Sequence, residues 1–425
     1  MKAVVLAAGE GTRMFPLTYA CPKPLLPVSG KPALKHILEG LKESGVSEVL
    51  VVVGRRQIDL VREALSDIKL KLEYVVQEEP KGTAHAASLA ETFVGGEDFL
   101  LINGDVLVPK NFYKKVLEVF RDSGGNVVSL ARVENVSNYG LVEVERGRVV
   151  RIVEKPERGE GGLVNAGIYA FTNEVFEELK RTPVSKRGEY ELTDTIQRMI
   201  DRGLPVVPCE VEGWWVDLGY PWDLLRANEL VMENSRGELV VHEGARVEGG
   251  ATIHPPVHVG DGSVIKAGAY IEGPVYIGRN SVIGPNCYIR PYTFIGDRCH
   301  IGNACEVKNS IIMDGTNIAH LSYVGDSIVG RNVNLGAGTI TANLRFDEKT
   351  VKSTVKGKRV DTGRRKMGAV IGDNVKTGVG AMFMPGVIVG PDSIIGPGVV
   401  VAENIPQGVT VLVKQELQVV RRNFQ

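Results

Sequence analysis

The sequence predicts a Rossmann-like α/β domain with a mixed sheet, followed by a parallel β-helix made of six-residue repeats. Over the first part of the chain, strand-like and helix-like segments alternate, which is typical of a sheet covered by helices. Further on, aliphatic residues recur at every sixth position. The length of 425 residues also exceeds what one hydrophobic core usually covers. We therefore expect domains at residues 1–232 and 238–408, and a C-terminal tail at 409–425.

Strands and helices of the α/β domain follow from apolar patterning. Helical spacing of apolar residues predicts helices over Lys31–Ser44 and Leu60–Leu65. Runs of branched and aromatic residues predict four strands, at Ala3–Ala7, Val49–Val53, Leu72–Gln77 and Phe99–Ile102.

The β-helix is predicted by a ladder of inward-pointing aliphatic residues. Twelve consecutive six-residue repeats keep their phase, at Val241, Val247, Ile253, Val259, Ile265, Ile271, Ile277, Ile283, Ile289, Ile295, Ile301 and Val307. The ladder continues at Ile312, Ile318, Val324, Ile371, Thr377, Phe383, Val389, Ile395 and Val401. Between 343 and 367 a charged insertion interrupts it, and the segment after Val401 is expected to cap the open end of the coil.

Charge and cysteine content narrow the class of protein. A net charge of −1 gives no electrostatic footprint for nucleic acid or an anionic membrane, so we expect small-molecule substrates. The five cysteines are scattered and form no C-x-x-C pair, which argues against a disulfide framework or a zinc site. No signal peptide is indicated, and no run approaches the roughly 20 apolar residues of a membrane-spanning helix. These features predict a cytoplasmic location.

A glycine-rich loop, LAAGEGTRM, follows the first predicted strand directly. Its backbone amides would lie at the carboxyl end of that strand, where open α/β sheets bind ligands, and phosphate is the natural guest. The loop lacks the third glycine of a dinucleotide fingerprint, and the chain contains no G-x-x-x-x-G-K-[ST] string, so dehydrogenase and P-loop functions are not indicated.

Several further motifs accompany this loop in a fixed order: PKPLLPV, QEEPKGTAHA, NGD, YG, VEKP, NAGIY and WVDLG. Together with LAAGEGTRMFPLT they resemble the sugar-1-phosphate nucleotidyltransferase family. In that family a sugar phosphate oxygen attacks the α-phosphorus of a nucleoside triphosphate and pyrophosphate leaves. The resemblance implies that Arg13 and Lys23 are catalytic, because they would neutralise the crowded phosphates. It also implies that Asp105 and Asp217 hold Mg²⁺.

The same resemblance implies two groups of binding residues. The nucleotide would contact Leu6, Ala8, Gly9, Gly11, Thr12, Gln77, Gly82 and Thr83. The sugar phosphate would contact Gly140, Glu154, Lys155 and Asn165. The amide of Gln77 can donate and accept at once, which matches the edge that uracil and thymine share. Glu154 has an alternative role as an ordinary salt-bridge partner of Lys155.

Two strings in the β-helix, AHLSYVGD and NLGAGTITAN, resemble the acetyltransferase half of the bifunctional glucosamine-1-phosphate acetyltransferase/N-acetylglucosamine-1-phosphate uridylyltransferase family. The resemblance implies that His320 is the general base, that the coil is left-handed and that the protein is a homotrimer. It further implies an acetyl acceptor site at Arg290, Lys308, Tyr323, Asn334 and Asn343. Acetyl-CoA, the second substrate, would contact Ala337, Thr377 and Val379.

Two alternative functions and two departures from the family pattern stay open. The β-helix of a monofunctional nucleotidyltransferase could be purely structural, and a non-catalytic regulatory subunit could share this layout. Val379 stands where the family commonly has serine, in a segment that resembles the coenzyme A contact. The insertion at 344–367 is longer than in typical bacterial members. Its Arg364-Arg365-Lys366 cluster is a candidate binding site for the phosphates of coenzyme A. The motifs do not distinguish UTP from dTTP, nor one sugar epimer from another.

Overall fold

The computed structural model describes residues 1–157, 159–234 and 237–422. The chain forms two compact units, each described separately below. The first comprises Met1–Met14 and Ala20–Ala227, and the second comprises Phe15–Tyr19 and Asn228–Gln425. The division falls inside helix α8 (Pro221–Glu233) rather than after it, and Asn228 of this helix donates a hydrogen bond to the carbonyl oxygen of Tyr292 at 2.8 Å.

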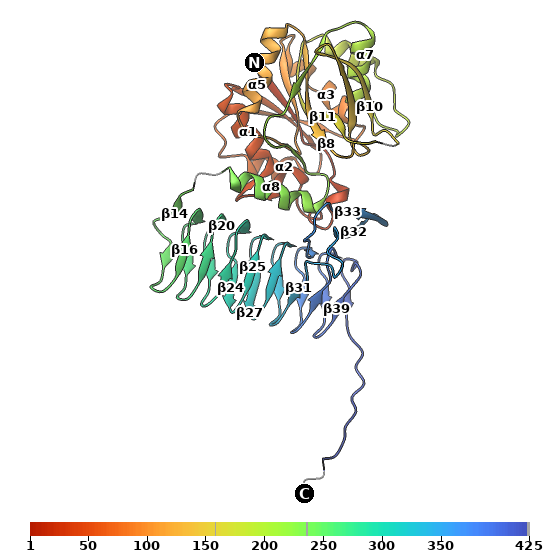
Figure 1. The fold of residues 1–425 in the computed structure, drawn as a ribbon. Helices are drawn as coiled ribbons and strands as arrows, with labels where there is room; N and C mark the ends of the chain where they lie inside the picture. Colours follow the sequence, from red (N-terminus) through yellow and green to blue (C-terminus); the bar gives the residue numbers. More distant parts are fainter. Residues whose placement is uncertain (158, 235–236, 423–425) are drawn as a thin grey trace. The chain divides into compact units, whose positions relative to one another are not determined.

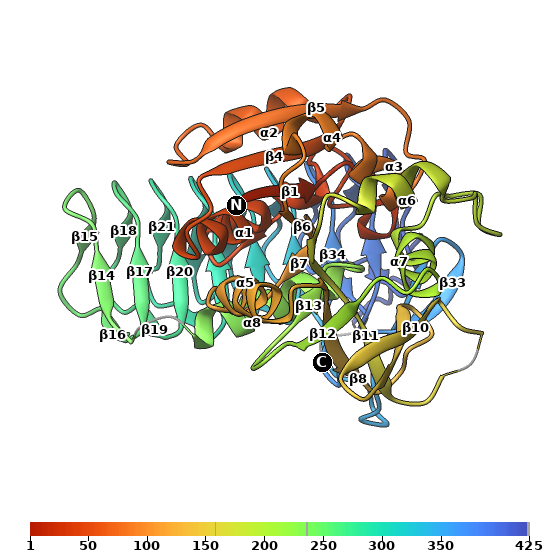
Figure 2. The same ribbon diagram turned by 90° about the horizontal axis from the view of Figure 1, so that it is seen from above.

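The first unit is built on a mixed sheet, so the predicted α/β class is confirmed. Its strands run in the order β10-β9-β11-β6-β1-β4-β5, with β8 beside β11 and β12 beside β8 (Figure 2). The strands are β1 (Lys2–Leu6), β4 (Glu48–Gly54), β5 (Lys71–Gln77), β6 (Phe99–Asn103), β8 (Asn126–Val133), β9 (Gly140–Glu145), β10 (Arg148–Glu154), β11 (Gly162–Phe171) and β12 (Val206–Glu210). Short paired strands lie outside it, at β2 (Pro27–Val28), β3 (Lys31–Pro32), β7 (Val106–Leu107) and β13 (Val216–Asp217).

Helices cover this sheet with their apolar sides. In α1 (Ala33–Glu43), the apolar residues at helical spacing, Leu34, Ile37, Leu38 and Leu41, are all fully buried. The other helices are α2 (Ile58–Ala64), α3 (Thr83–Ser88), α4 (Glu91–Val94), α5 (Phe112–Ser123), α6 (Val175–Arg181) and α7 (Leu192–Asp201). Within the described residues, no helix is long and apolar enough to cross a membrane.

The order of strands decides where a ligand can bind. Strands β6, β1 and β4 are parallel neighbours, so their carboxyl ends meet at one edge of the sheet. The glycine-rich loop leaves β1 at this edge, and the segment that contains Asp105 leaves β6 beside it. The backbone amide of Gly104 donates to the carbonyl oxygen of Leu6 at 2.8 Å, which ties the two segments together.

The second unit is a parallel β-helix, as predicted (Figure 1). Its described residues form three parallel sheets that run along the coil. One contains β14 (Leu239–Val241), β17 (Val257–Val259), β20 (Val275–Ile277), β23 (Thr293–Ile295), β26 (Ile311–Ile312), β29 (Ile328–Val329), β34 (Val370–Ile371) and β37 (Ile388–Val389). The next contains β15 (Arg246–Val247), β18 (Val264–Ile265), β21 (Val282–Ile283), β24 (His300–Asn303), β27 (Asn317–His320), β30 (Asn334–Leu335), β35 (Lys376–Thr377), β38 (Ile394–Ile395) and β40 (Thr410–Val411). The third contains β16 (Thr252–His254), β19 (Tyr270–Glu272), β22 (Tyr288–Ile289), β25 (Glu306–Lys308), β28 (Tyr323–Gly325), β31 (Ile340–Thr341), β36 (Met382–Phe383) and β39 (Val400–Val401).

The aliphatic ladder fills the interior of this coil. From Val259 to Val401, the ladder residues named above are buried. The first ladder residues, Val241 and Val247, are exposed, because the first coil has a neighbouring coil on one side only. One corner of the coil needs a left-handed backbone, with φ between 53° and 71°, and is made by Gly262, Asn280, Arg298, Gly315, Asn332, Asn374 and Asp392.

Two parts of the second unit depart from a plain coil. The insertion folds as an antiparallel hairpin of β32 (Lys352–Val355) and β33 (Lys358–Asp361). The segment after Val401 covers the end of the coil as far as β40, since Ile405 and Val411 pack against the core, and the expected cap is wrong only for the described residues beyond β40. The coil continues to β40, and beyond it Leu417, Val419 and Val420 are exposed in a segment without secondary structure.

Candidate active sites

Two neighbouring cavities lie at the carboxyl edge of the sheet in the first unit. We call the larger one, of about 390 Å³, the nucleotide cavity, and the smaller one, of about 240 Å³, the sugar cavity. Thr83, Asn103, Asp105 and Glu189 line both cavities. A ligand group held beside Asp105 can therefore be reached from either side.

The nucleotide cavity brings together all eight residues that were predicted to bind nucleotide. They are Leu6, Ala8, Gly9, Gly11, Thr12, Gln77, Gly82 and Thr83. The chain positions them through the ends of β1 and β5 and through the first turn of α3. Their roles as ligand contacts remain predictions.

Gln77 is held in one orientation by its neighbours. Its amide nitrogen donates to the carbonyl oxygen of Gly82 at 3.2 Å and lies 2.9 Å from Nδ1 of His85. Gly82 has φ of 108°, and a Cβ atom there would lie 2.4 Å from the carbonyl oxygen of Tyr190. Only glycine fits this position, because both the backbone angle and the available space exclude a side chain.

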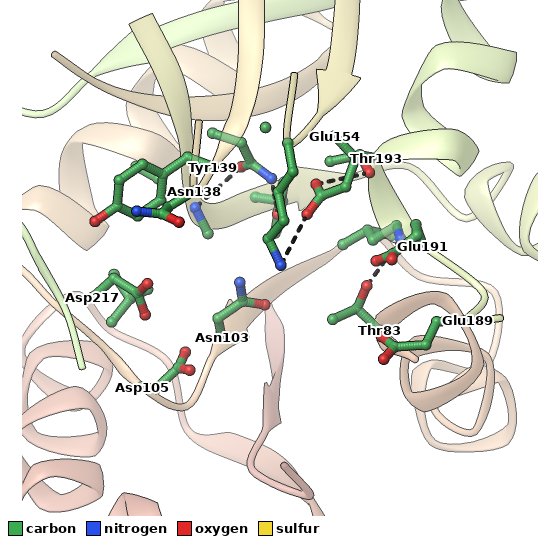
Figure 3. Close-up of a pocket in the computed structure, with 18 of the residues that line it drawn as sticks. Thr83, Asn103, Asp105, Asn138, Tyr139, Glu154, Glu189, Glu191, Thr193 and Asp217 are labelled. Carbon is green, nitrogen blue, oxygen red and sulfur yellow. Dashed lines mark hydrogen bonds and ion pairs between the residues drawn. The ribbon is translucent and has the colours of Figure 1, made fainter. Parts of the chain in front are cut away.

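The sugar cavity collects the predicted sugar and metal residues from several strands and the loops that follow them (Figure 3). Its lining includes Arg13, Asp105, Gly140, Glu154, Lys155, Asn165 and Asp217. Asp105 and Asp217 lie near each other on one side, and Glu154 lies with Thr193 across the cavity (Figure 3). The cavity thus has an acidic end beside the nucleotide cavity and a polar pocket beyond it.

Lys23 and Asp105 form a close ion pair beside the cavities. The ammonium nitrogen of Lys23 lies 2.5 Å from Oδ2 of Asp105, and the lysine is almost completely buried. Burial alone would lower the pKa of Lys23, but the charges of Asp105 and Asp217 raise it above its ordinary value. Lys23 therefore stays a cation at neutral pH.

For Asp217, unlike Lys23, burial and the neighbouring carboxylate shift the pKa in the same direction. Burial, followed by the negative charge of Asp105, raises the pKa of Asp217 well above its ordinary value. Lys23 and Arg13 act against this shift. Two carboxylates have thus been placed where their mutual repulsion favours binding of a cation.

The two carboxylates suit a magnesium ion in their chemistry. Mg²⁺ prefers hard oxygen ligands and is usually held by one or two carboxylates, with water and substrate phosphates completing its shell. Among the described residues there is no group of three or more side chains that could enclose a metal by themselves. Asp105 and Asp217 match a site that is completed by a phosphate substrate.

Arg13 is positioned by aromatic packing. Its guanidinium carbon lies 5.0 Å from the ring centre of Tyr220, and that ring stacks on Trp222 at 4.8 Å. The backbone amide of Tyr220 donates to the carboxylate of Asp223 at 2.6 Å. Burial and the charge of Asp217 raise the pKa of Asp223 to about 7.

Glu154 forms part of a hydrogen-bonded wall of the sugar cavity. It accepts a hydrogen bond from the hydroxyl of Thr193 at 3.2 Å and from Arg187 at 3.4 Å. Its Oε1 also lies 3.7 Å from the ammonium nitrogen of Lys155, so the alternative salt bridge is formed while Glu154 still lines the cavity. On the same wall, beside Gly140, Asn165 donates to the hydroxyl of Tyr169 at 2.7 Å.

Sequence reasoning missed several residues that line the sugar cavity. They are Asn103, Asn138, Tyr139, Tyr169, Arg187, Glu189, Glu191, Thr193 and Trp215. Asn103 belongs to the motif NGD and Tyr139 to the motif YG, so the sequence could have indicated both as site residues. Arg187 and Thr193 had no such signal, because they reach the cavity through long-range packing.

In the β-helix, the predicted general base and two predicted acetyl-CoA contacts stack on one corner. The amide of Gly338 donates to the carbonyl oxygen of His320 at 3.2 Å, and the amide of Gly380 donates to that of Ala337 at 2.8 Å. His320, Ala337 and Val379 therefore occupy the same corner on three successive coils. His320 and Val379 are exposed, so a ligand can reach this corner.

Thr377 departs from its prediction as an acetyl-CoA contact. Its side chain is buried inside the coil, where the hydroxyl accepts from the amide of Gly336 at 2.9 Å and lies 2.9 Å from the hydroxyl of Thr339. This is the inward position that the six-residue ladder predicts. A side-chain contact between Thr377 and acetyl-CoA is therefore wrong.

The predicted acceptor residues lie mainly on the sheet that contains β25, β28 and β31. Tyr323 lies beside Asn343, whose amide donates to the tyrosine hydroxyl at 3.1 Å. Arg290 and Lys308 belong to successive coils. Asn334 is exposed on β30, in the neighbouring sheet. Burial is the main cause that raises the pKa of Tyr323.

The basic cluster of the insertion is partly engaged in ion pairs. Arg364 lies 2.6 Å from Oε1 of Glu229, and Arg365 pairs with Glu348 within the insertion. The hypothesis that all three cations bind coenzyme A loses much of its support, because Arg364 is largely buried.

Comparisons with known families agree with both units. Residues 2–234 match the nucleotidyl transferase family. In the β-helix, residues 271–378 match the GMPPB C-terminal domain, residues 244–272 the hexapeptide repeat of succinyl-transferase, and residues 368–403 the bacterial transferase hexapeptide.

Individual relatives extend the match over nearly the whole chain. The bifunctional protein GlmU of Methanococcus maripaludis is 43% identical over 99% of this chain and 100% of its own length. The bifunctional sugar-1-phosphate nucleotidylyltransferase/acetyltransferase of Sulfurisphaera tokodaii is 39% identical over 91% and 94%. A crystal structure from Bacillus anthracis, assigned as a glucose-1-phosphate thymidylyltransferase and solved with sucrose, covers 56% of this chain and 98% of its own, with 30% identity and a TM-score of 0.52.

The fold and the comparisons define a two-domain transferase with a nucleotidyltransferase domain and a left-handed, hexapeptide-repeat acyltransferase domain. The chain belongs to the family of bifunctional nucleotidyltransferase/acetyltransferases that includes the two relatives above. A monofunctional or purely regulatory protein is accordingly not the preferred interpretation.

Proposed function

We propose that the N-terminal domain transfers UMP or dTMP from UTP or dTTP to a sugar 1-phosphate and releases pyrophosphate. The observation that carries this proposal is the position of Asp105 and Asn103, which line both the nucleotide cavity and the sugar cavity. A triphosphate in one and a sugar phosphate in the other bring their phosphates together there. Holding two reactants in line supplies much of the catalysis of such a transfer.

Arg13 and Lys23 supply the positive charge for this step. An oxygen of the sugar phosphate forms a bond to the α-phosphorus as the bond to the bridging oxygen of pyrophosphate breaks. Lys23, held by Asp105, stabilises the charge on the α-phosphate, and the guanidinium of Arg13 holds the leaving phosphates. Mg²⁺ at Asp105 and Asp217 supplies further neutralisation of the phosphate charge when bound.

The base and the sugar are recognised by side chains already held in place. Gln77 presents its fixed amide to uracil or thymine, and Gly82 leaves room for the base. Glu154 accepts hydrogen bonds from sugar hydroxyls, and Lys155 binds the sugar phosphate. Gly140 and Asn165 form the remaining wall.

For the β-helix domain, we propose acetyl transfer from acetyl-CoA to the amino group of an amino-sugar 1-phosphate. His320 removes a proton from the amine as its nitrogen bonds to the acetyl carbon, and the carbon–sulfur bond breaks to release coenzyme A as a thiol. Arg290 and Lys308 bind the phosphate of the acceptor, and Tyr323, Asn334 and Asn343 orient the sugar. Ala337 and Val379 contact acetyl-CoA, and the backbone is the part of Thr377 left for such a contact, because its side chain is buried.

The assembly we propose is a homotrimer formed through the β-helix, in the cytoplasm. The outward column of the third β-helix sheet supports an interface between copies, because Ile340, Met382 and Val400 are exposed apolar residues on successive coils. A contiguous apolar stripe of this kind is stabilised when a second copy covers it.

The decisive experiment separates the two activities. Full-length protein is supplied with acetyl-CoA and glucosamine 1-phosphate while free thiol is measured, and pyrophosphate release from UTP and a sugar 1-phosphate is measured in parallel. His320→Ala should abolish thiol release and leave pyrophosphate release intact, whereas His254→Ala, on the first turn of the same solenoid, should change neither. Equal thiol release from all three proteins would contradict the assignment of His320.

A further inference from the structure

The insertion between 344 and 366 delivers a buried arginine to the predicted acceptor site. Arg364 stands near the end of the insertion, where the chain rejoins the coil through a bridge between Leu344 and Lys366. The amide of Met367 also donates to the carbonyl oxygen of Asn343 at 2.9 Å. The backbone therefore fixes where Arg364 enters the domain.

Asp326 is the centre of the cluster that Arg364 joins. Its carboxylate is almost fully buried, and Oδ2 accepts from Asn343 at 2.5 Å and lies 3.3 Å from the ammonium nitrogen of Lys308. Oδ1 accepts from Asn309 at 2.9 Å and lies 4.0 Å from Arg364. One aspartate thus holds two of the residues predicted to bind the acetyl acceptor.

Glu229 closes the cluster from the other side. It accepts hydrogen bonds from Arg364 at 2.6 Å and from Asn309 at 2.9 Å, and both members of the Arg364–Glu229 pair are largely buried. Buried charges are tolerated only when they are paired and hydrogen-bonded, so the four charged groups depend on one another.

From this arrangement we infer that Arg364 is a positioning residue of the acetyltransferase site, acting through Asp326 on Lys308 and Asn343. The inference rests on the proposed acetyl transfer. Arg364 neutralises part of the negative charge of Asp326. The ammonium group of Lys308 is therefore attracted less strongly to the aspartate and can also bind the phosphate of the acceptor. Without Arg364, Lys308 would be the only cation beside Asp326 among the described residues and Glu229 would lose its ion pair with the arginine, so the anchor of Asn343 beside Tyr323 would be loosened.

This role differs from direct binding of coenzyme A by the same arginine. A positioning residue for the acceptor changes the KM for the amino-sugar 1-phosphate, whereas a phosphate contact to coenzyme A changes the KM for acetyl-CoA. Arg365, the adjacent cation, pairs with Glu348 inside the insertion and contacts none of the cluster, which makes it the matched control.

The test compares thiol release by the full-length protein and its Arg364→Met, Arg364→Lys and Arg365→Met variants. Arg364→Met should raise the KM for glucosamine 1-phosphate by about tenfold or more, with the KM for acetyl-CoA unchanged. Arg364→Lys should recover part of this loss, because lysine keeps the charge but lacks the planar fork of arginine. Arg365→Met should match the unmodified protein.

Glu229→Gln is the second variant, for the case in which Arg364→Met unfolds the coil. It should also raise the KM for the amino-sugar phosphate, and Glu229→Gln combined with Arg364→Met should be no worse than Arg364→Met alone, since glutamine can still accept from Asn309 and the double variant buries no carboxylate at position 229. A raised KM for acetyl-CoA in Arg364→Met, or equal behaviour of Arg364→Met and Arg365→Met, overturns the inference alone. Absence of thiol release from the unmodified protein overturns the proposed acetyl transfer and the inference with it.

Discussion

The ammonium group of Lys23 and the carboxylate of Asp105 lie 2.5 Å apart, and the second carboxylate, Asp217, contributes to the raised pKa of the lysine. A single cation is thus shared by two groups that are candidates for metal binding. This relationship links the binding of phosphate to the binding of magnesium, because Mg²⁺ competes with Lys23 for the carboxylate of Asp105, and a phosphate competes with Asp105 for the ammonium group of Lys23.

Replacing Lys23 by methionine should abolish most nucleotidyl transfer. We expect a loss of about 100-fold or more in kcat, because a preorganised charge at the α-phosphate disappears and Asp105 loses its partner. Pyrophosphate release measures this directly, and thiol release from acetyl-CoA should not change. Lys110→Met is the control, since Lys110 pairs with Glu39 and Glu43 away from both cavities. A Lys23→Met enzyme as active as Lys110→Met would contradict the role.

The apparent affinity for Mg²⁺ in nucleotidyl transfer should fall as the pH is lowered from about 8 to about 5.5. The pKa of Asp217 is raised, so protons compete with the metal for this carboxylate at a higher pH than for an ordinary aspartate, by up to about tenfold per pH unit. Magnesium titrations at several pH values, at a fixed concentration of the magnesium–triphosphate complex, measure the effect. A constant affinity over this range would show that Asp217 is not a ligand.

The raised pKa of Asp217 also makes the stability of the protein depend on pH when no metal is present. A carboxyl group whose pKa is raised on folding binds more protons in the folded state than in the unfolded state. The contribution of Asp217 to the free energy of unfolding therefore decreases as the pH rises from its ordinary pKa of 3.8 to the raised value, and is constant above it. Thermal unfolding of Asp217→Asn should lack this component of the pH dependence.

His85 should act on nucleotide binding through Gln77. His85→Leu removes one of the two partners of the Gln77 amide and leaves only the longer bond to Gly82, so the amide can rotate away from the base, and we expect the KM for UTP and for dTTP to rise by about tenfold each. The KM for the sugar phosphate should stay the same. His85→Gln, which restores a hydrogen-bonding side chain, should recover part of the affinity, whereas a His85→Leu enzyme with an unchanged KM would show that Gln77 needs no support.

The fold was predictable from sequence because its signals are local and repeated. The six-residue ladder and the helical spacing of Leu34 and Ile37 each reflect burial of one face of an element. Side chains that reach the cavities from distant segments gave no such signal. Arg187 reaches Glu154 across 33 positions, and Arg364 reaches Glu229 across 135. For Thr377 the sequence held a signal that was not used. This residue was predicted to contact acetyl-CoA, although its place in the six-residue ladder already indicated a side chain inside the coil.

Gly140→Ala should weaken sugar binding selectively. A Cβ atom there would lie 3.1 Å from Cγ2 of Thr193 and 3.3 Å from Oε2 of Glu154, so it would push Glu154 out of its hydrogen bond. We expect the KM for the sugar 1-phosphate to rise by about tenfold, with the KM for the triphosphate unchanged. Gly249→Ala, at a position with open space around it, is the control. An equal rise of both KM values would indicate general damage to the domain rather than a specific effect on the sugar cavity.

Ile301→Ala should open the middle of the β-helix locally. Ile301 is fully buried between Cys299 and Cys305, and its truncation should cost about 2–5 kcal/mol. Each coil contacts only its neighbours, so the loss of stability should appear first in these coils.

The two cysteines report this local opening, because burial raises the pKa of Cys299 to about 12 and keeps its thiol unreactive in the closed coil. Thiol labelling under native conditions should become at least about 30-fold faster in Ile301→Ala, since 2 kcal/mol corresponds to that factor in the open population. Ile394→Ala, at an exposed position on a later coil and outside the proposed interface, should label within about twofold of the unmodified protein. Equal labelling of the two variants would contradict the prediction, because it would mean that truncation of Ile301 does not increase opening of the coil around the two cysteines.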